Sequence, residues 1–221
     1  MTNNHYLILL VDDHPLITSS FQSAFKTIEK KKQTQFKIET AHSFQLAITA
    51  LIKNTYDVVF LDVQMPSLES ENIFSGEDLG SRIRTQHPNT KIVTVTTFND
   101  NYRIHSIIEQ ISPDGFLIKN DLTPEELELA IEKVLLDPPY YSKTVIQSMR
   151  KYISNDFILD KTDRELLYYL SRGASLSAIA DQLSLSRAAI AKRKQHLKEV
   201  FNVEGSENIE LLEKARKKGF I

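Results

Sequence analysis

Short apolar runs alternate with longer amphipathic stretches through the first 136 residues. The runs are rich in β-branched and aromatic residues and lack the polar alternation of a half-exposed strand, which is typical of strands buried on both faces of a parallel sheet. They occupy residues 6–11, 36–40, 58–61, 92–95 and 116–118. The stretches between them have helical spacing and occupy residues 14–30, 43–54, 76–86, 100–110 and 123–136. Five strands alternating with five helices predict an α/β doubly wound fold on a five-stranded parallel sheet.

The pattern changes after Asp137-Pro138-Pro139, where the prolines end the last of these helices. We therefore predict an α/β domain over residues 1–137 and a linker over 138–160, with a short helix near 145–152. Beyond the linker, residues 161–221 have only helical patterns and predict a small all-α domain.

The all-α domain has the pattern of a helix-turn-helix. Thr162-Asp163-Arg164-Glu165 has the spacing of a capping box, and Gly173 follows the helix that it would begin. A short amphipathic helix over 176–183 and a tight turn then lead to Ser186, the expected N-cap of a longer helix that reaches about residue 201. In a helix-turn-helix the second of these helices enters the major groove of DNA. A fourth helix is expected over 207–217.

Composition narrows the possible functions. The 221 residues contain no cysteine, which excludes disulfides, thiolate metal sites and a cysteine nucleophile. The longest apolar run, residues 6–11, is too short to cross a bilayer, and the N-terminus lacks the pattern of a secretory signal. We therefore expect a cytoplasmic protein with no membrane partner.

Charge is distributed unevenly along the chain. Residues 161–221 carry 12 basic and 8 acidic side chains, a net charge of +4, whereas the rest of the chain carries −6. The asymmetry favours a polyanionic partner for the all-α domain, and scattered surface charge is the alternative.

Side chains suited to phosphoryl chemistry stand at the ends of four predicted strands. Asp12 and Asp13 follow the first strand, Asp62 the third, Thr96 ends the fourth and Lys119 follows the fifth. Ligands of open α/β sheets bind beyond the carboxyl ends of the strands, so we expect these side chains to share one crevice. Three carboxylates repel one another unless a proton or a cation neutralises them, and oxygen ligands favour Mg²⁺. A carboxylate can also accept a phosphoryl group, stabilised by Mg²⁺, a lysine and a threonine.

Two alternatives compete with a phosphoryl-acceptor site. Each of these residues taken alone is an ordinary solvated turn residue, although five suitable residues at four strand ends make coincidence a poor explanation. The chain could also be an aspartate-nucleophile phosphatase. Many such enzymes have a second Asp two residues after the nucleophile, and Gln64 at that position disfavours this alternative.

Over about residues 5–137 the sequence resembles the receiver domain of two-component response regulators. The matching segments are Leu9-Leu10-Val11-Asp12-Asp13-His14, Val59-Phe60-Leu61-Asp62-Val63-Gln64-Met65-Pro66, Thr94-Val95-Thr96 and Gly115-Phe116-Leu117-Ile118-Lys119. The resemblance implies that Asp62 accepts a phosphoryl group from a sensor histidine kinase. It also implies that Asp13, Asp62 and the main-chain carbonyl of Gln64 bind Mg²⁺, with Asp12 acting through water.

The resemblance further implies a switch. Thr96 and Lys119 would engage the phosphoryl group, and Phe116 would turn inward once Thr96 moves. A plain core position is the alternative for Phe116. Phosphorylation would then promote homodimerisation and DNA binding.

One loop departs from the resemblance. Nine residues, 67–75, separate Pro66 from Gly76, where the family usually has about three. A tolerated surface insertion is the simplest interpretation. The alternative hypothesis is that this acidic loop shapes the choice of kinase.

The longer helix of the all-α domain is strongly basic, with no acidic residue between 187 and 198. Basic side chains supply affinity for phosphates, whereas side chains at base edges supply specificity. The expected DNA contacts are Ser186, Arg187, Ala191, Lys192, Arg193, Lys194, Gln195 and Lys198. A tail that contacts RNA or protein is the alternative.

Residues 160–221 resemble the LuxR-type helix-turn-helix. The matching pieces are Thr162-Asp163-Arg164-Glu165, Ile179-Ala180, Leu183-Ser184-Leu185-Ser186, Ile190 and Phe201-Asn202-Val203. The family's groove-reading positions fall on Ala191, Lys192 and Gln195, of which Gln195 suits adenine and Lys192 suits guanine. The family usually has Thr, Lys and His at positions 189, 191 and 193, so this chain need not prefer the same DNA sequence. We interpret the chain as a phosphorylation-controlled DNA-binding transcriptional regulator rather than an enzyme.

Overall fold

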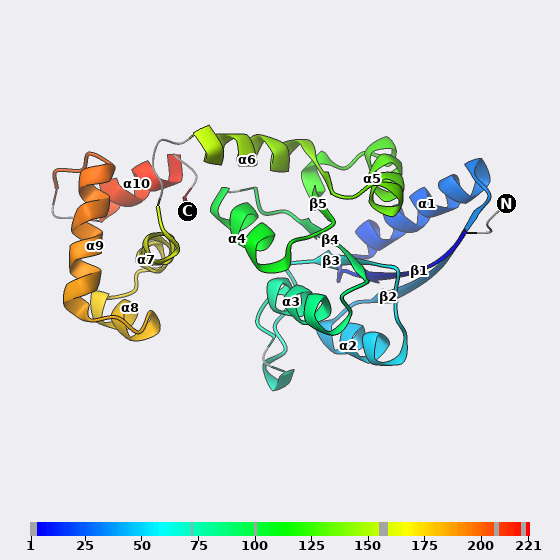
Figure 1. Cartoon of the computed structure of the whole chain (residues 1–221), viewed down its shortest axis with the longest axis horizontal. Coiled ribbons are helices and arrows are strands. Elements are labelled where there is room, and N and C mark those ends of the chain that lie inside the picture. The colour runs from blue at the N-terminus through cyan, green and yellow to red at the C-terminus, as the bar shows by residue number, and fades with distance from the viewer. Residues whose placement is uncertain (1–3, 72, 100, 155–158, 206–207, 218–219) are drawn as a thin grey trace. The chain divides into compact units, whose positions relative to one another are not determined.

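A computed structural model describes residues 4–71, 73–99, 101–154, 159–205, 208–217 and 220–221 (Figure 1). Residue 100, residues 155–158 and residue 207, which belong to predicted elements, lie outside the described residues. Contacts divide the chain into two compact units, of which the first comprises residues 1–99 and 106–146 and the second comprises residues 100–105 and 147–221. Within the described ranges, no helix is both long enough and apolar enough to cross a membrane.

The first unit is built on a parallel sheet with strand order β2-β1-β3-β4-β5-β6. The strands are β1 (Asn4–Val11), β2 (Thr34–Ala41), β3 (Val58–Asp62), β4 (Lys91–Thr96), β5 (Gly115–Ile118) and β6 (Tyr140–Tyr141). Val11 pairs with Leu61, and Asp62 pairs with Val95. The carboxyl ends of β1, β3 and β4 therefore meet at the same edge of the sheet.

The five predicted strands are confirmed, but the sheet has a sixth strand. β6 contains only Tyr140 and Tyr141, which pair with Gly115 and Phe116 of β5. It lies in the segment predicted as a linker. Two residues are too few to show a period, so hydrophobic patterning could not reveal this strand.

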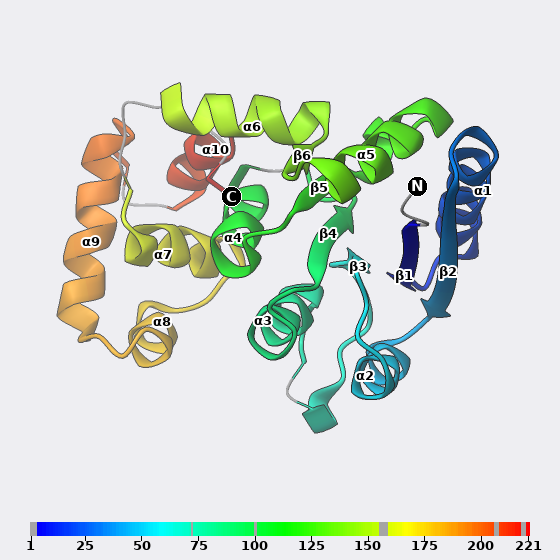
Figure 2. The same ribbon diagram turned by 45° about the vertical axis from the view of Figure 1, so that its right-hand side comes forward.

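Helices cover both faces of the sheet, because side chains of successive strand residues point to opposite faces. The helical elements are α1 (Pro15–Lys31), α2 (Phe44–Lys53), the 3-10 turn η1 (Glu69–Glu71), α3 (Gly76–Gln86), α4 (Asn101–Ile111), the 3-10 turn η2 (Lys119–Asp121) and α5 (Pro124–Leu136). Figures 1 and 2 show α1 and α5 on one side of the sheet and α2 and α3 on the other. Ile8 and Leu10 of β1 join Phe25 of α1 and Val134 of α5 in one core.

The helix predicted near residues 145–152 is α6 (Lys143–Ser154), which is longer than expected. Its first turn is held to η2 by Asp121. Asp121 Oδ2 accepts hydrogen bonds from Ser142 Oγ (2.7 Å) and Thr144 N (2.9 Å). Partial burial opposes ionisation of Asp121, but these hydrogen bonds outweigh it and lower its pKa. The start of α6 is therefore part of the first unit.

The second unit contains α7 (Lys161–Ser171), α8 (Leu176–Gln182), α9 (Arg187–Val200) and α10 (Ile209–Lys217). Leu166, Ile190 and Leu211 meet in its core, so one apolar face from each of three helices is buried together. The helix-turn-helix arrangement is as predicted, with Ser184 in the left-handed region (φ 53°) in the turn between α8 and α9.

The predicted capping box at Thr162 is wrong. Asp160 is the N-cap of α7, and its side chain accepts a hydrogen bond from Asp163 N at 2.8 Å. Thr162 lies inside the first turn, because Asp160 caps the helix two residues earlier.

Candidate functional site

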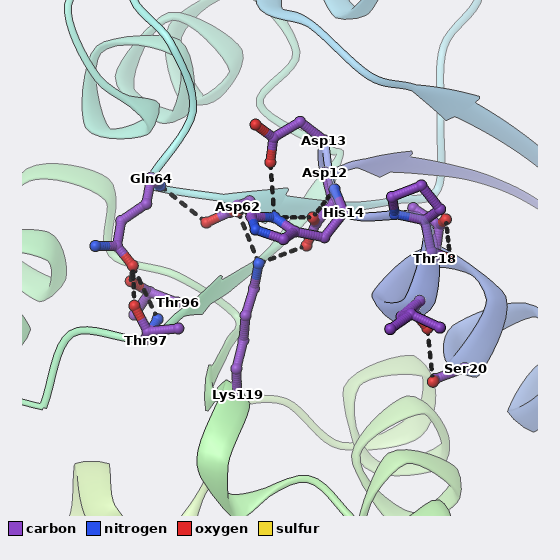
Figure 3. Close-up of polar contacts among 12 residues, drawn as sticks. Asp12, Asp13, His14, Thr18, Ser20, Asp62, Gln64, Thr96, Thr97 and Lys119 are labelled. Atoms are coloured by element: carbon purple, nitrogen blue, oxygen red, sulfur yellow. Dashed lines mark hydrogen bonds and ion pairs between the residues drawn. The ribbon is translucent and has the colours of Figure 1, made fainter.

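Acidic side chains gather at the carboxyl ends of β1 and β3 (Figure 3). Asp12 and Asp13 follow β1 directly, and Asp62 is the last residue of β3. One ligand atom from each of Asp12, Asp13, His14 and Asp62 lies within 4.8 Å of the others. Asp12 and Asp62 are buried, whereas Asp13 is partly exposed. The structure thus brings together the three carboxylates that the sequence places in one crevice.

Lys119, which begins η2 directly after β5, supplies a positive charge to this cluster. Its Nζ lies 2.8 Å from Asp62 Oδ2 and 2.9 Å from Asp12 Oδ2. Burial opposes protonation of Lys119, but the hydrogen bonds to Asp62 and Asp12 outweigh burial and raise its pKa. The amine therefore remains an ammonium ion.

Asp62 experiences opposing electrostatic effects. Burial raises the pKa of its carboxyl group, and nearby Asp12 raises it further. Hydrogen bonds from Lys119 and from Gln64 N, the latter 2.8 Å from Asp62 Oδ1, act in the opposite direction. The net direction is upward, because the effect of burial outweighs that of the hydrogen bonds and of the Lys119 charge. An additional cation would stabilise the ionised form.

Thr96 ends β4 and is fully buried. Its Oγ1 accepts a hydrogen bond from Phe98 N at 3.1 Å and lies 3.4 Å from Gln64 Oε1. Gln64 Oε1 also accepts a hydrogen bond from Thr97 N at 3.2 Å and contacts the Thr97 hydroxyl. The role predicted for Gln64 concerned its main-chain carbonyl. The structure adds a side-chain contact that joins the loops after β3 and β4.

Phe116, the predicted switch residue, lies on β5 and has no exposed surface. It pairs with Thr94 on β4, and its main-chain oxygen accepts a hydrogen bond from Ser142 N at 2.9 Å. Its inward movement stays a prediction.

His14 belongs to the cluster, although sequence analysis assigned no ligand role to it. Its Nδ1 lies 2.7 Å from Asp13 Oδ1, 3.2 Å from Asp12 Oδ1 and 3.9 Å from Asp62 Oδ2. The sequence could have indicated this neighbour, because His14 directly follows the paired aspartates. The turn between β1 and α1 brings its ring back toward them.

The 67–75 loop folds back on itself and onto α3. Leu68 and Ile73 form an antiparallel bridge, and the Leu68 N–H donates to the Ile73 carbonyl at 2.7 Å. Glu71 forms an ion pair with Arg82 of α3 at 2.9 Å. At the base of the loop, Gly76 N donates to the main-chain oxygen of Val63, the residue after Asp62, at 3.1 Å. The loop is therefore attached beside Asp62.

α9 presents part of the predicted DNA contacts on an exposed face. Ser186 caps the helix, with Ala189 N donating to its Oγ at 3.1 Å. The exposed residues among the predicted contacts are Ser186, Arg187, Ala191, Lys192 and Gln195. His196, which sequence analysis did not single out, is also exposed beside Gln195. The residues that the LuxR resemblance assigns to base reading thus lie on the accessible side of α9.

The other three predicted contacts are less accessible. Arg193 Nη1 lies 2.7 Å from Asp160 Oδ2 and 2.8 Å from Asp163 Oδ1, and these carboxylates raise the pKa of Arg193. Lys198 is buried and donates to the Gly205 carbonyl at 2.6 Å. Lys194 is half-buried, and burial lowers its pKa. Arg193 and Lys198 therefore hold the helical unit together.

The sequence of the first unit matches a known protein family. The family model described as response regulator receiver domain matches residues 8–132, which is more than half of the chain. The chain belongs to the response regulator receiver family. The cluster of carboxylates at the carboxyl edge of the sheet lies within this receiver domain.

Relatives of this receiver protein extend over nearly the whole chain. The oxygen regulatory protein NreC of Staphylococcus epidermidis is 26% identical over 224 residues, which cover 96% of this chain and 97% of NreC. Among solved structures, two RcsB dimers bound to two parallel DNAs give a TM-score of 0.66 at 20% identity, covering 96% of this chain and 98% of RcsB. RcsB from Salmonella enterica serovar Typhimurium, bound to promoter rprA in the presence of the phosphomimetic BeF3-, gives 0.64 at 19% identity and covers 95% and 97% of the two chains. The fold of both units is therefore shared with RcsB.

Proposed function

We propose that this chain is a DNA-binding response regulator of the cytoplasm whose activity is controlled by phosphorylation of Asp62. The observation that carries the proposal is the grouping of Asp62 with Asp12, Asp13 and the Lys119 ammonium ion in one corner of the first unit. A sensor histidine kinase would be the phosphoryl donor. An oxygen of Asp62 attacks the phosphorus atom, the bond from phosphorus to the donor imidazole breaks, and an acyl phosphate forms.

The residues of this corner fit a divalent cation. Asp12 Oδ2 and Asp13 Oδ1 are shielded from solvent, and each lies within ion-pair distance of a nitrogen atom, of Lys119 and His14 respectively. Asp12, Asp13, Asp62 and the Gln64 main-chain carbonyl would hold Mg²⁺. When bound, the ion would compensate the charge on the transferred oxygens.

The residues around Asp62 would then respond to its phosphorylation. Lys119 would contact the phosphoryl oxygens, and Thr96 would leave Gln64 to do the same. The movement of Thr96 opens space toward which Phe116 turns. The receiver surface would have two alternative conformations, and phosphorylation would favour the one that promotes dimerisation and DNA binding.

The second unit would bind double-stranded DNA through the exposed face of α9. Lys192 and Gln195 would reach base edges, and Ser186 and Arg187 would contact phosphates. The RcsB structures, in which that protein is bound to DNA and forms dimers, support this interface. Arg193 and Lys198 would remain outside this interface, because their charged groups are engaged inside the unit.

The phosphoryl-acceptor role is tested by labelling with acetyl phosphate in Mg²⁺, followed by intact mass measurement. We expect one phosphoryl group on the wild-type protein and none on Asp62→Asn. Retained labelling of Asp62→Asn at one equivalent would contradict the assignment. Gel shifts on genomic DNA fragments, with and without phosphorylation, test the second unit. Binding to RNA but not to duplex DNA would favour the alternative partner.

A further inference from the structure

We propose that His14 is an additional ligand of the carboxylate site and that it gives this receiver a preference for divalent transition metals over Mg²⁺. The inference rests on the proposed function, since it concerns the cation held beside Asp62. It extends that function by naming a nitrogen donor at a site otherwise composed of oxygen atoms.

The separations between donor atoms suit a shared ion. Ligands about 2.1 Å from a metal stand about 3 Å apart when adjacent and about 4.2 Å apart when opposite in an octahedron. His14 Nδ1 lies 2.7, 3.2 and 3.9 Å from oxygen atoms of Asp13, Asp12 and Asp62, respectively. One ion can therefore contact the imidazole and these carboxylates with only small movements of the side chains.

The local structure directs the ring of His14 toward the site. His14 is the N-cap residue of α1, but its side chain makes no capping hydrogen bond. Its main-chain N–H donates to Asp12 Oδ1 at 2.8 Å, which folds the turn so that Nδ1 faces the carboxylates (Figure 3). The side chain is 62% exposed, so one side of the site is open to an entering ion and its remaining water ligands.

The chemistry of the donor atoms determines which cations the site prefers. Mg²⁺ prefers oxygen ligands and gains little from imidazole, whereas Ni²⁺ and Zn²⁺ bind imidazole well. His14 would therefore strengthen transition-metal binding and leave Mg²⁺ binding almost unchanged. The ratio of the two affinities is the quantity that His14 would set.

His42 provides a matched control. It is an exposed histidine next to the same site, and its Nδ1 lies 3.0 Å from the main-chain oxygen of Asp12. It is outside the group of side chains whose ligand atoms converge. Replacing His42 removes a neighbouring imidazole but leaves the proposed donor set intact.

The test uses the full chain as wild type, His14→Ala, His14→Asn and His42→Ala, titrated separately with Mg²⁺ and Ni²⁺ by calorimetry. We expect Ni²⁺ affinity to fall roughly tenfold or more in both His14 variants, comparable at least to the loss of a supporting residue around a metal. Mg²⁺ affinity should change less than about twofold, and His42→Ala should behave as wild type. Equal losses for both metals, or none for Ni²⁺, would overturn the proposal.

Electron spin-echo envelope modulation of bound Mn²⁺ gives a second, direct readout, because it detects nitrogen atoms coordinated to the ion. Wild type and His42→Ala should show coupling to a ligand nitrogen, and both His14 variants should lose it. Absence of nitrogen coupling in the wild type would also overturn the proposal. Labelling of Asp62 by acetyl phosphate in Mg²⁺ is measured on the same preparations. Normal labelling without nitrogen coupling leaves the proposed function standing, whereas no labelling at all counts against that function itself.

Discussion

Replacing Gly76 with alanine would test how closely the start of α3 is packed against the end of β3. A Cβ at Gly76 would lie 2.5 Å from Val63 Cα and 2.7 Å from the main-chain oxygen of Asp62. Carbon atoms need about 3.5–4 Å, so the two segments would have to separate by about 1 Å. Both neighbours are main-chain atoms, so no rotamer change relieves the overlap. We expect a loss of about 2–3 kcal/mol in the free energy of unfolding, more than the roughly 0.5–1 kcal/mol that alanine gains over glycine in a helix.

Two other glycines provide graded controls for urea unfolding followed by circular dichroism. The three atoms nearest to a Cβ at Gly80 would all belong to the side chain of Ile111, with Cδ1 at 2.6 Å, and a Cβ at Gly205 would meet nothing within 4 Å. The expected order of destabilisation is Gly76→Ala, then Gly80→Ala, then Gly205→Ala. Labelling of Asp62 by acetyl phosphate should slow in Gly76→Ala, because the displaced main chain includes Asp62 itself. If Gly76→Ala is as stable as Gly80→Ala and is labelled at the wild-type rate, the reasoning is refuted.

Three further predictions concern other contacts. Gln64→Ala removes the acceptor that holds Thr97, so we expect faster exchange of the Thr97 amide proton with solvent; an unchanged NMR exchange rate would contradict this. Lys192→Ala should weaken binding to a selected DNA fragment by about 1–3 kcal/mol and relax the base preference at the contacted position, as measured by fluorescence anisotropy on fragments that differ at single base pairs. Burial opposes ionisation of Asp160, but Asp163 N–H and Arg193 lower its pKa. Its ionised form therefore stabilises the fold above the unfolded-state pKa of 3.8, and this stabilisation disappears as pH falls through the lower folded-state value. Asp160→Asn, which keeps a capping side chain, should be less stable than wild type near neutral pH, and the gap in urea midpoints should close in acid.

The sheet and its acidic edge could be predicted because the signals are strong and local. Buried parallel strands give apolar runs, and the residue after each run lies at the carboxyl edge whatever the exact packing. Asp12, Asp62 and Lys119 therefore meet where the sequence places them. The register of neighbouring strands aligns the strand ends that carry them, with Val11 beside Leu61, Asp62 beside Val95 and Thr96 beside Ile118.

Other features depend on contacts that no local pattern records. β6 can be recognised as a strand only from its pairing with β5. The sequence alone predicts that Arg193 contacts DNA, because it does not show the ion pairs of Arg193 with Asp160 and Asp163. The same holds for Lys198, because the sequence of a basic helix does not indicate that one of its ammonium groups donates a hydrogen bond to a carbonyl inside the unit. Tertiary contacts decide which of several similar charges face solvent.

Lys119 and Asp121 occupy the two ends of one 3-10 turn, η2. The first holds the carboxylates at the edge of the sheet, and the second holds the opening turn of α6 through Ser142 and Thr144. A 3-10 helix rises about 2 Å per residue, so these two anchor points stand only a few ångströms apart along a continuous backbone. A shift of the lysine toward a newly arrived phosphate would consequently pull on the root of the connecting helix. The covalent chain, rather than a series of contacts between surface side chains, would thus link the proposed phosphoryl site to the segment that leads into the second unit.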